Sequence, residues 1–258
     1  MNSIRALKYI SVFTIPLTVF IALSLKGWFT YLTFIEAFIL VPFLELFLNA
    51  DESNLGKAEK EMIQSDRFYD VLLYLVLPIQ YGFLIFFLFT VQESLLWWEL
   101  TGRISAFGIL CGVLGINVAH ELGHRKSKTE RLMSKMLLLT SLYMHFYIEH
   151  NRGHHKNVGT IEDPASSRLN ESLYAFWIRS IIYSWLSAWK IEFKRMAILG
   201  KANFSLSNQM LQFQIMQLLL IASIAIIFGW FVAFCFVSSA VIGFLLLETV
   251  NYIEHYGL

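Results

Sequence analysis

The sequence predicts an all-α integral membrane protein with about six transmembrane helices and a histidine-rich region on the cytoplasmic side. Three observations predict this fold class. The 258-residue chain is 57% hydrophobic and only 15% charged, with a mean hydropathy of +0.58. Its apolar residues form runs of about 20, the length that a helix needs to cross a bilayer. All seven histidines lie between or after those runs.

The predicted spans follow from these apolar runs. In chain order they are residues 9–25, 31–48, 68–90, 104–119, 211–229 and 231–250. No small-residue cleavage site precedes Lys26, so we expect a retained first helix rather than a signal peptide. The last two spans form one long apolar stretch that we divide near Gly229. We expect residues 1–258 to be one membrane domain, with the histidine-bearing cytoplasmic segment at residues 120–210.

The distribution of basic residues predicts which side each polar segment faces. If the N-terminus is cytoplasmic, all 20 lysines and arginines except Lys26 and Arg103 face the cytoplasm, a strong positive-inside bias. Two further segments, Leu132–Ile148 and Leu173–Ile191, are apolar but interrupted by charges. We expect half-buried or interfacial helices there.

The histidines fall in three motifs, HELGH at 120–124, HFYIEHNRGHH at 145–155 and NYIEHYGL at 251–258. Histidine near the membrane interior is costly, so this clustering favours a function. His120 and His124 stand at i and i+4 and project from one helix face, which makes a two-ligand platform for a metal ion. On the predicted topology all three motifs lie at the cytoplasmic ends of the spans, where they can meet.

The second motif predicts a second metal ion. His150 and His154 repeat the i, i+4 spacing, while His155 points about 100° further round a regular helix. We therefore expect that His154 and His155 cannot easily share one ion with His150. Six imidazoles exceed one tetrahedral zinc site, so we predict two ions with all-nitrogen ligation, and imidazole suits iron, copper and zinc alike. The predicted ligands are His120, His124, His150, His154, His155 and His255.

Other polar residues near the motifs are candidates for hydrogen bonds to the ligand imidazoles. They are Asn117, Glu121, Glu149, Glu248, Asn251 and Glu254. His145 lies off the ligand face of His150 and is interpreted as a packed histidine. Cys111 and Cys235 belong to no metal-binding spacing and are interpreted as core hydrophobes, which excludes a built-in iron–sulfur centre.

Two other classes of site fit part of this pattern. HELGH also satisfies H-E-x-x-H, the zinc metalloprotease motif with Glu121 as general base, but that leaves the later histidines unexplained. A bis-histidine haem bundle needs two opposed histidines rather than clusters. The net charge of +1 gives no indication of a polyanionic partner, and we expect no nucleic acid.

HELGHRK, EHNRGHH and NYIEHYGL resemble the histidine boxes of the membrane-bound alkane 1-monooxygenases, within the superfamily of membrane desaturases and hydroxylases with histidine-bound di-iron. The stretch TIEDPASSRLNESLYAFW, residues 160–177, is also similar to the family's sequence at that place. Arg125 stands where the family often has lysine. The family has a further box resembling LQRHSDHH, with three more iron ligands, downstream of the HYG motif. The sequence ends at Leu258, so we expect a C-terminally incomplete chain.

The resemblance implies the terminal hydroxylation of medium- or long-chain n-alkanes to primary alcohols, with O₂ and two non-haem iron ions. It implies an apolar substrate from the lipid bilayer, the inner (cytoplasmic) membrane as location, and electrons from a rubredoxin-type donor with its reductase. A xylene- or fatty-acid-type hydroxylase is the alternative within the superfamily. Because rubredoxin is acidic, basic residues around the second motif are candidates for its docking. They are Arg125, Lys126, Lys128, Arg131, Arg152 and Lys156.

Overall fold

The computed structural model of the protein describes residues 11–47, 67–160 and 162–256, and the regular elements in these ranges are all helical. In chain order they are η1 (Ser11–Phe13), α2 (Thr14–Ser24), η2 (Gly27–Tyr31), α3 (Leu32–Ile35), η3 (Glu36–Leu40), α4 (Val41–Glu45), α6 (Arg67–Thr90), α7 (Trp97–Ile109), η4 (Leu110–Ile116), α8 (Asn117–His124), α9 (Lys128–Thr140), α10 (Phe146–Glu149), η5 (His150–His154), α11 (His155–Asn157), α12 (Leu173–Ile198), α13 (Gln209–Phe228) and α14 (Trp230–Glu254). This confirms the predicted all-α membrane fold.

Among the described residues, five helices are long and apolar enough to cross a membrane, judged by length and composition. They are Gly27–Glu45, Arg67–Thr90, Trp97–His124, Gln209–Phe228 and Trp230–Glu254. They overlap the five later predicted spans. The first predicted span, residues 9–25, corresponds to the shorter apolar helix Ser11–Ser24, and its first two residues lie outside the described part of the chain.

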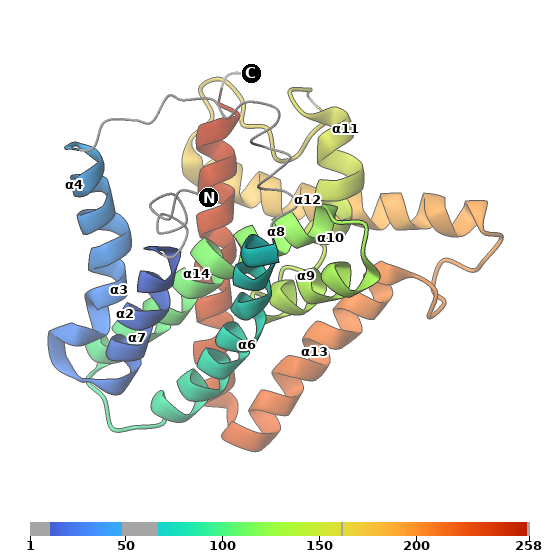
Figure 1. Ribbon diagram of the computed structural model, residues 1–258. Coiled ribbons are helices and arrows are strands. Elements are labelled where there is room, and N and C mark those ends of the chain that lie inside the picture. Colours follow the sequence, from blue (N-terminus) through green and yellow to red (C-terminus); the bar gives the residue numbers. More distant parts are fainter. Residues whose placement is uncertain (1–10, 48–66, 161, 257–258) are drawn as a thin grey trace.

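Helix α14 lies at the centre of the arrangement, and the helix formed by α7, η4 and α8 packs against it (Figure 1). The approach is close because the contact is made by glycines. A Cβ atom on Gly108 would lie 2.7 Å from the carbonyl oxygen of Ser239, and one on Gly112 would lie 2.7 Å from that of Gly243. Such small-residue contacts let membrane helices pack backbone against backbone.

Local signals in the sequence end and begin the helices around this centre. Gly229, with φ of +92°, separates α13 from α14, a conformation that an L side chain would strain. The side chain of Asn208 accepts a hydrogen bond from the Leu211 amide (3.1 Å) and caps α13. Ser172 caps α12 in the same way through the Ala175 amide (3.3 Å).

The helix termini away from the histidines are joined by Arg103, whose side chain is fully buried. Its guanidinium donates hydrogen bonds to the carbonyl oxygens of Thr90 (2.6 Å) and Leu25 (3.2 Å) and lies 3.2 Å from the Glu93 carboxylate. These contacts hold the ends of α2, α6 and α7 together. A buried charge of this kind is tolerated because both terminal nitrogens of the guanidinium are paired.

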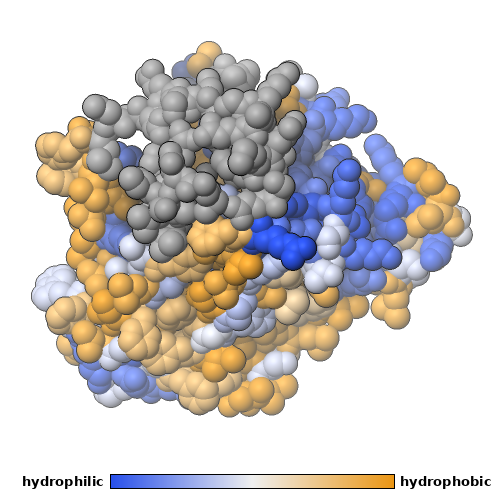
Figure 2. All heavy atoms as spheres, viewed as in Figure 1, coloured by the Kyte–Doolittle hydropathy of each residue, from blue (hydrophilic) through white to orange (hydrophobic). Residues whose placement is uncertain are grey.

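The surface divides into an apolar and a polar part. Figure 2 shows mostly hydrophobic residues over the lower part of the viewed face and hydrophilic residues gathered at the upper right. Helix α12 includes the predicted interfacial segment Leu173–Ile191, and α9 includes only the first part of the other segment, Leu132–Ile148, whose last residues belong to α10. Neither α9 nor α12 is among the helices long and apolar enough to cross. Helix α12 runs crosswise to α14 (Figure 1).

Candidate metal centre

The first histidine motif forms the end of the long helix that starts at α7. The i, i+4 spacing in α8 places the rings of His120 and His124 on one face, with their centroids 4.8 Å apart. Helix α9 packs against α8, and the Ser134 hydroxyl of α9 donates a hydrogen bond to the carbonyl oxygen of Ala119 in α8 (2.6 Å). The platform predicted from the spacing is therefore present.

The second motif is not a regular α-helix. Residues His150–His154 form a π-helical turn, η5, between α10 and α11. Because a π turn holds more residues than an α turn, His150 and His155 face the same way, with ring centroids 4.5 Å apart. The regular helical period assumed for this motif was wrong, because the π turn places the His155 ring beside the His150 ring.

Four imidazoles thus form one group. One ring nitrogen from each of His120, His124, His150 and His155 lies within 4.8 Å of all the others. The rings of His120 and His150 are closest, with centroids 4.3 Å apart. The Nε2 atoms of His124 and His155 lie 3.3 Å apart. We call these residues the four-histidine group.

His154 turns away from this group and faces His255 at the end of α14, with ring centroids 5.1 Å apart. The Nδ1 atom of His154 lies 2.9 Å from the Asp163 carboxylate, and Nδ1 of His255 donates to the carbonyl oxygen of Asn251 (2.9 Å). A carbonyl oxygen and a carboxylate only accept, so both Nδ1 atoms carry a proton, and in the neutral ring the Nε2 atom is the one that offers a lone pair. We call His154 and His255 the histidine pair.

Asp163 is a site residue that the sequence reasoning missed. Its side chain is buried, with 1% of its surface exposed, and it also accepts hydrogen bonds from the Ser166 hydroxyl (2.5 Å) and the Ala165 amide (3.1 Å). Burial alone would raise the pKa of Asp163, but the hydrogen bonds from His154 and Ser166 outweigh it and lower the pKa. The signal available was an acidic residue in the loop directly after the second motif.

The environment of His150 favours its neutral form. Burial, followed by the neighbouring imidazoles, lowers the pKa of His150 to about 2. Its Nε2 atom is buried and has no hydrogen-bond partner among the residues that the structure describes. A buried nitrogen without a partner beside three other imidazole nitrogens is the donor set that a metal ion satisfies, so the residues present fit a metal ion bound through nitrogen.

The six candidates for hydrogen bonds to the imidazoles have different partners. Glu248 accepts from Tyr143 (2.8 Å) and Ser180 (2.5 Å), and buried Glu149 accepts from Ser187 (3.4 Å). Burial raises the pKa of Glu149 to about 7.

The remaining candidates point elsewhere or to solvent. The Asn117 side chain donates to the carbonyl oxygen of Val113 (2.8 Å), Glu121 pairs with Arg125 (3.1 Å), and Glu254 is exposed. Asn251 contacts His255 through its main-chain carbonyl.

His145 lies apart from both sets of histidines. Its ring packs against Tyr143, with centroids 4.2 Å apart, and makes no ring contact with the six predicted ligands within the described ranges. Burial lowers its pKa to about 3, so the side chain is a neutral, packed imidazole.

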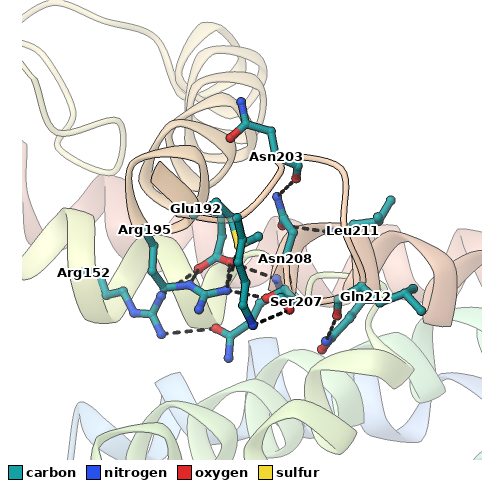
Figure 3. Close-up of polar contacts among 12 residues, drawn as sticks. Arg152, Glu192, Arg195, Asn203, Ser207, Asn208, Leu211 and Gln212 are labelled. Carbon is teal, nitrogen blue, oxygen red and sulfur yellow. Dashed lines mark hydrogen bonds and ion pairs between the residues drawn. The ribbon is translucent and has the colours of Figure 1, made fainter. Parts of the chain in front are cut away.

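A clamp of charged side chains fixes the second motif to two other helices (Figure 3). The fully buried carboxylate of Glu192 in α12 accepts hydrogen bonds from Arg152 (2.8 Å), from Arg195 (2.8 and 2.7 Å) and from the Gln209 amide (2.9 Å). Arg152 belongs to η5 and Gln209 begins α13. Sequence reasoning did not identify Glu192, because an acidic residue in an apolar helix gives no indication of its partners.

The candidate docking residues divide into paired and unpaired cations. Arg125 lies 3.3 Å from Asp70 and 3.1 Å from Glu121, and Arg152 belongs to the clamp. The other four make no ion pair with any described residue. These are Lys126, Lys128, Arg131 and Lys156.

The part of the chain that carries the histidine motifs is similar to known proteins. Residues 95–258 match the fatty acid desaturase family. The chain is 38% identical over 246 residues to alkane 1-monooxygenase 1 of Alcanivorax borkumensis, which covers 91% of this chain and 59% of that protein. It is 38% identical over 241 residues to alkane 1-monooxygenase of Ectopseudomonas oleovorans, covering 93% of this chain and 58% of that protein.

A third relative has a different name. The chain is 29% identical over 198 residues to the xylene/toluene monooxygenase hydroxylase component of Pseudomonas putida, which covers 74% of this chain and 53% of that protein. The chain therefore spans less than three fifths of the length of each of these three curated relatives.

Proposed function

The chain belongs to the fatty acid desaturase family, in the histidine-rich di-iron superfamily of membrane desaturases and hydroxylases, and we propose that it carries the histidine centre of an alkane 1-monooxygenase. The proposed reaction is the terminal hydroxylation of medium- or long-chain n-alkanes to primary alcohols, with O₂ and two electrons. The observation that carries this proposal is the convergence of four imidazoles from two distant motifs, with a further pair beside them.

The proposed ligands are assigned from this geometry. The four-histidine group would hold one iron ion, and the histidine pair would contribute two nitrogens to a second. Bound iron supplies the O₂ activation that breaking an unactivated C–H bond requires, which no side chain of the protein can supply alone.

The protein's own residues orient and shield the site. Asp163 holds the His154 ring with Nε2 directed away from the carboxylate, and the Asn251 carbonyl does the same for His255. The Glu192 clamp fixes η5, and with it His150 and His154, against α12 and α13. Phe146 stacks on the His150 ring, with centroids 4.8 Å apart, and limits the access of water to it.

Electrons must come from outside the chain. We propose a rubredoxin-type donor that docks on Lys126, Lys128, Arg131 and Lys156, which have no ion-pair partner in the described part of the chain, on the cytoplasmic side of the inner membrane. Acidic donors approach such a cationic surface faster at low ionic strength. The positive-inside distribution of the basic residues supports this side.

A xylene-type hydroxylase is the second candidate, and the similarity to the xylene/toluene monooxygenase component favours it. A fatty-acid substrate is a further alternative, because the matching family is that of the fatty acid desaturases. The metalloprotease interpretation is not proposed, because Glu121 pairs with Arg125 at the surface and the two HELGH histidines share their group with two more imidazoles.

The test is metal analysis followed by product analysis. Membranes containing the chain would receive n-octane, n-hexadecane, p-xylene and palmitate in parallel, with O₂ and a rubredoxin-type donor. We expect iron at fewer than two ions per chain and a 1-alkanol product. Zinc without iron, or an aromatic alcohol as the main product, would contradict the proposal and separate the alternatives.

A further inference from the structure

Helix α12 carries large apolar side chains on its outward face and has polar residues at half of its buried positions. Its outward side chains include Tyr174 (71% exposed), Ile178 (65%), Ile182 (50%) and Trp185 (38%). Residues three or four apart share a helix face, so these four form one continuous apolar stripe. The stripe facing the protein consists of Phe176, Ser180, Ser184, Ala188, Glu192 and Met196, all buried. This is the reverse of a helix on a water-exposed surface, where polar residues face outward.

The inner face is tied to the histidine centre by hydrogen bonds. Ser180 donates to Glu248 (2.5 Å), and Trp177 donates to Thr249 (3.2 Å) in the same turn of α14. Glu192 receives the guanidinium of Arg152 from η5. These hydrogen bonds fix the position of α12 relative to the second histidine motif and to the end of α14, which carries His255.

A third face of α12 is cationic. Arg179, Tyr183, Lys190 and Lys194 stand at i, i+4, i+11 and i+15 and lie along one flank of the apolar stripe. The Arg179 guanidinium pairs with the Glu171 carboxylate (2.6 Å), so the charge of this flank comes from Lys190 and Lys194. Lys190 and Lys194 are exposed and make no ion pair within the described residues. A cavity of about 490 Å³ on this flank is lined by Arg168, Arg179, Tyr183 and Lys190 and by one acidic residue, Glu162. Positive charge beside an aromatic hydroxyl fits phosphate groups.

We propose that α12 lies in the plane of the bilayer surface, with its apolar stripe in the acyl region and its cationic flank at the phosphates of anionic lipids. Three observations point to lipid as the occupant. The helix runs crosswise to α14, which is long and apolar enough to span (Figure 1). Its apolar stripe is rich in aromatic side chains, which gather at membrane interfaces. Its charges lie beside that stripe rather than within it, which is the pattern of an interfacial helix.

The consequence concerns substrate delivery. The inner face of α12 is hydrogen-bonded to the helices that carry the second and third motifs. If α12 lies at the bilayer surface, the histidine centre therefore lies next to that surface. An apolar molecule dissolved in the bilayer then reaches that level without entering water. This consequence rests on the proposed function, whereas the position of α12 does not.

Nitroxide labels on single introduced cysteines test the position of α12. The variants are Ile178→Cys, Ile182→Cys and Lys194→Cys, with the unsubstituted protein as the labelling blank because Cys111 and Cys235 are buried. In vesicles of phosphatidylcholine and phosphatidylglycerol, power saturation compares collisions with O₂, which concentrates in the acyl region, and with a water-soluble nickel chelate. We expect Ile178 and Ile182 labels to favour O₂ several-fold over the Lys194 label. Equal nickel accessibility at all three positions would overturn the proposal, whether or not the protein hydroxylates alkanes.

A second measurement tests the cationic flank. Spin-labelled phosphatidylglycerol and phosphatidylcholine report which lipid the protein surface prefers. We expect a preference for phosphatidylglycerol of about two-fold or more that declines toward one in Lys190→Gln/Lys194→Gln. The matched control is Lys126→Gln/Lys128→Gln, which removes the same charge away from α12 and should keep the preference. Equal effects of both pairs would refute a specific role of this flank, and an unchanged preference in the first pair would do the same.

Discussion

The four-histidine group and the histidine pair are built in different ways. The group takes its imidazoles from α8 and the second motif, and its rings face one another without intervening carboxylates. The pair joins the end of η5 to the end of α14, and each of its rings is held by an acceptor at Nδ1. The difference teaches that local helical geometry pairs the imidazoles within each motif of the group, and tertiary packing then brings the two motifs together. The pair has no such local partner and depends on tertiary packing and oriented acceptors.

Removing the central imidazole should have the largest effect. The His150 ring lies within 5.2 Å, centroid to centroid, of His120, His124, His154 and His155, so it borders both halves. We expect His150→Ala to lose most bound iron and to form alcohol at least about 100-fold more slowly, because a ligand loss exceeds the 10–100-fold cost of losing its support.

The control for this change is His145→Leu, which removes a buried imidazole outside both halves. Iron content by mass spectrometry should stay near that of the unsubstituted protein. If His145→Leu lost iron and His150→Ala kept it, the assignment of the group would be wrong.

Removing the acceptor of the pair should have the next largest effect. Asp163→Asn keeps the shape of the side chain but no longer fixes a negative acceptor at Nδ1 of His154. We expect a decrease of about 10–100-fold in metal affinity or turnover, with the four-histidine group retaining its ion. Metal titration monitored by absorption of bound cobalt measures this, and Glu162→Gln, an exposed neighbour, is the matched control. An Asp163→Asn protein that binds metal as tightly as the unsubstituted protein would contradict the role given to this carboxylate.

Breaking the Glu192 clamp should lower the stability of the whole protein and so affect both the four-histidine group and the histidine pair. Glu192→Ala leaves two guanidinium groups without their carboxylate, and because both are about a third exposed we expect a cost of about 1–3 kcal/mol rather than the full penalty of a buried pair. Thermal unfolding in detergent measures it. The thermal stability of Glu192→Gln should lie between that of the unsubstituted protein and that of Glu192→Ala.

The same clamp predicts a pH dependence. Burial raises the pKa of Glu192, but the hydrogen bonds from Arg195 and Gln209 outweigh it and hold the pKa below the ordinary value of 4.5. A depressed carboxyl pKa contributes stability above the unfolded value, and this stability is lost as the pH falls through the folded value. The unsubstituted protein should therefore lose stability more steeply below pH 4.5 than Glu192→Gln does. Parallel curves would exclude the clamp as the source.

Charge reversal at the surface should have the smallest effect, and it should leave both halves intact. In Lys126→Glu/Lys128→Glu we expect the KM for the donor to rise several-fold at low salt, with kcat and iron content unchanged, because steering acts on encounter. Lys26→Glu is the control, since Lys26 lies at the other end of the spans on the predicted topology. Donor kinetics that do not depend on ionic strength in either variant would remove the docking proposal.

Much of the fold follows from the sequence because apolar length is a direct physical requirement for crossing a bilayer. The i, i+4 platform of His120 and His124 could be predicted for a similar reason, since a regular helix fixes it. The partnership of His150 with His155 could not, because it depends on a π turn. Asp163 and Glu192 were missed because their partners are set by tertiary packing, which spacing in the chain does not encode.

The most direct test of the central claim is iron K-edge absorption spectroscopy on the purified protein loaded with less than one equivalent of iron. We predict a first coordination shell dominated by imidazole nitrogens, with the outer-atom scattering typical of histidine, and its loss in His150→Ala but not in His145→Leu. A first shell of carboxylate or water oxygens that is the same in both variants would contradict the account.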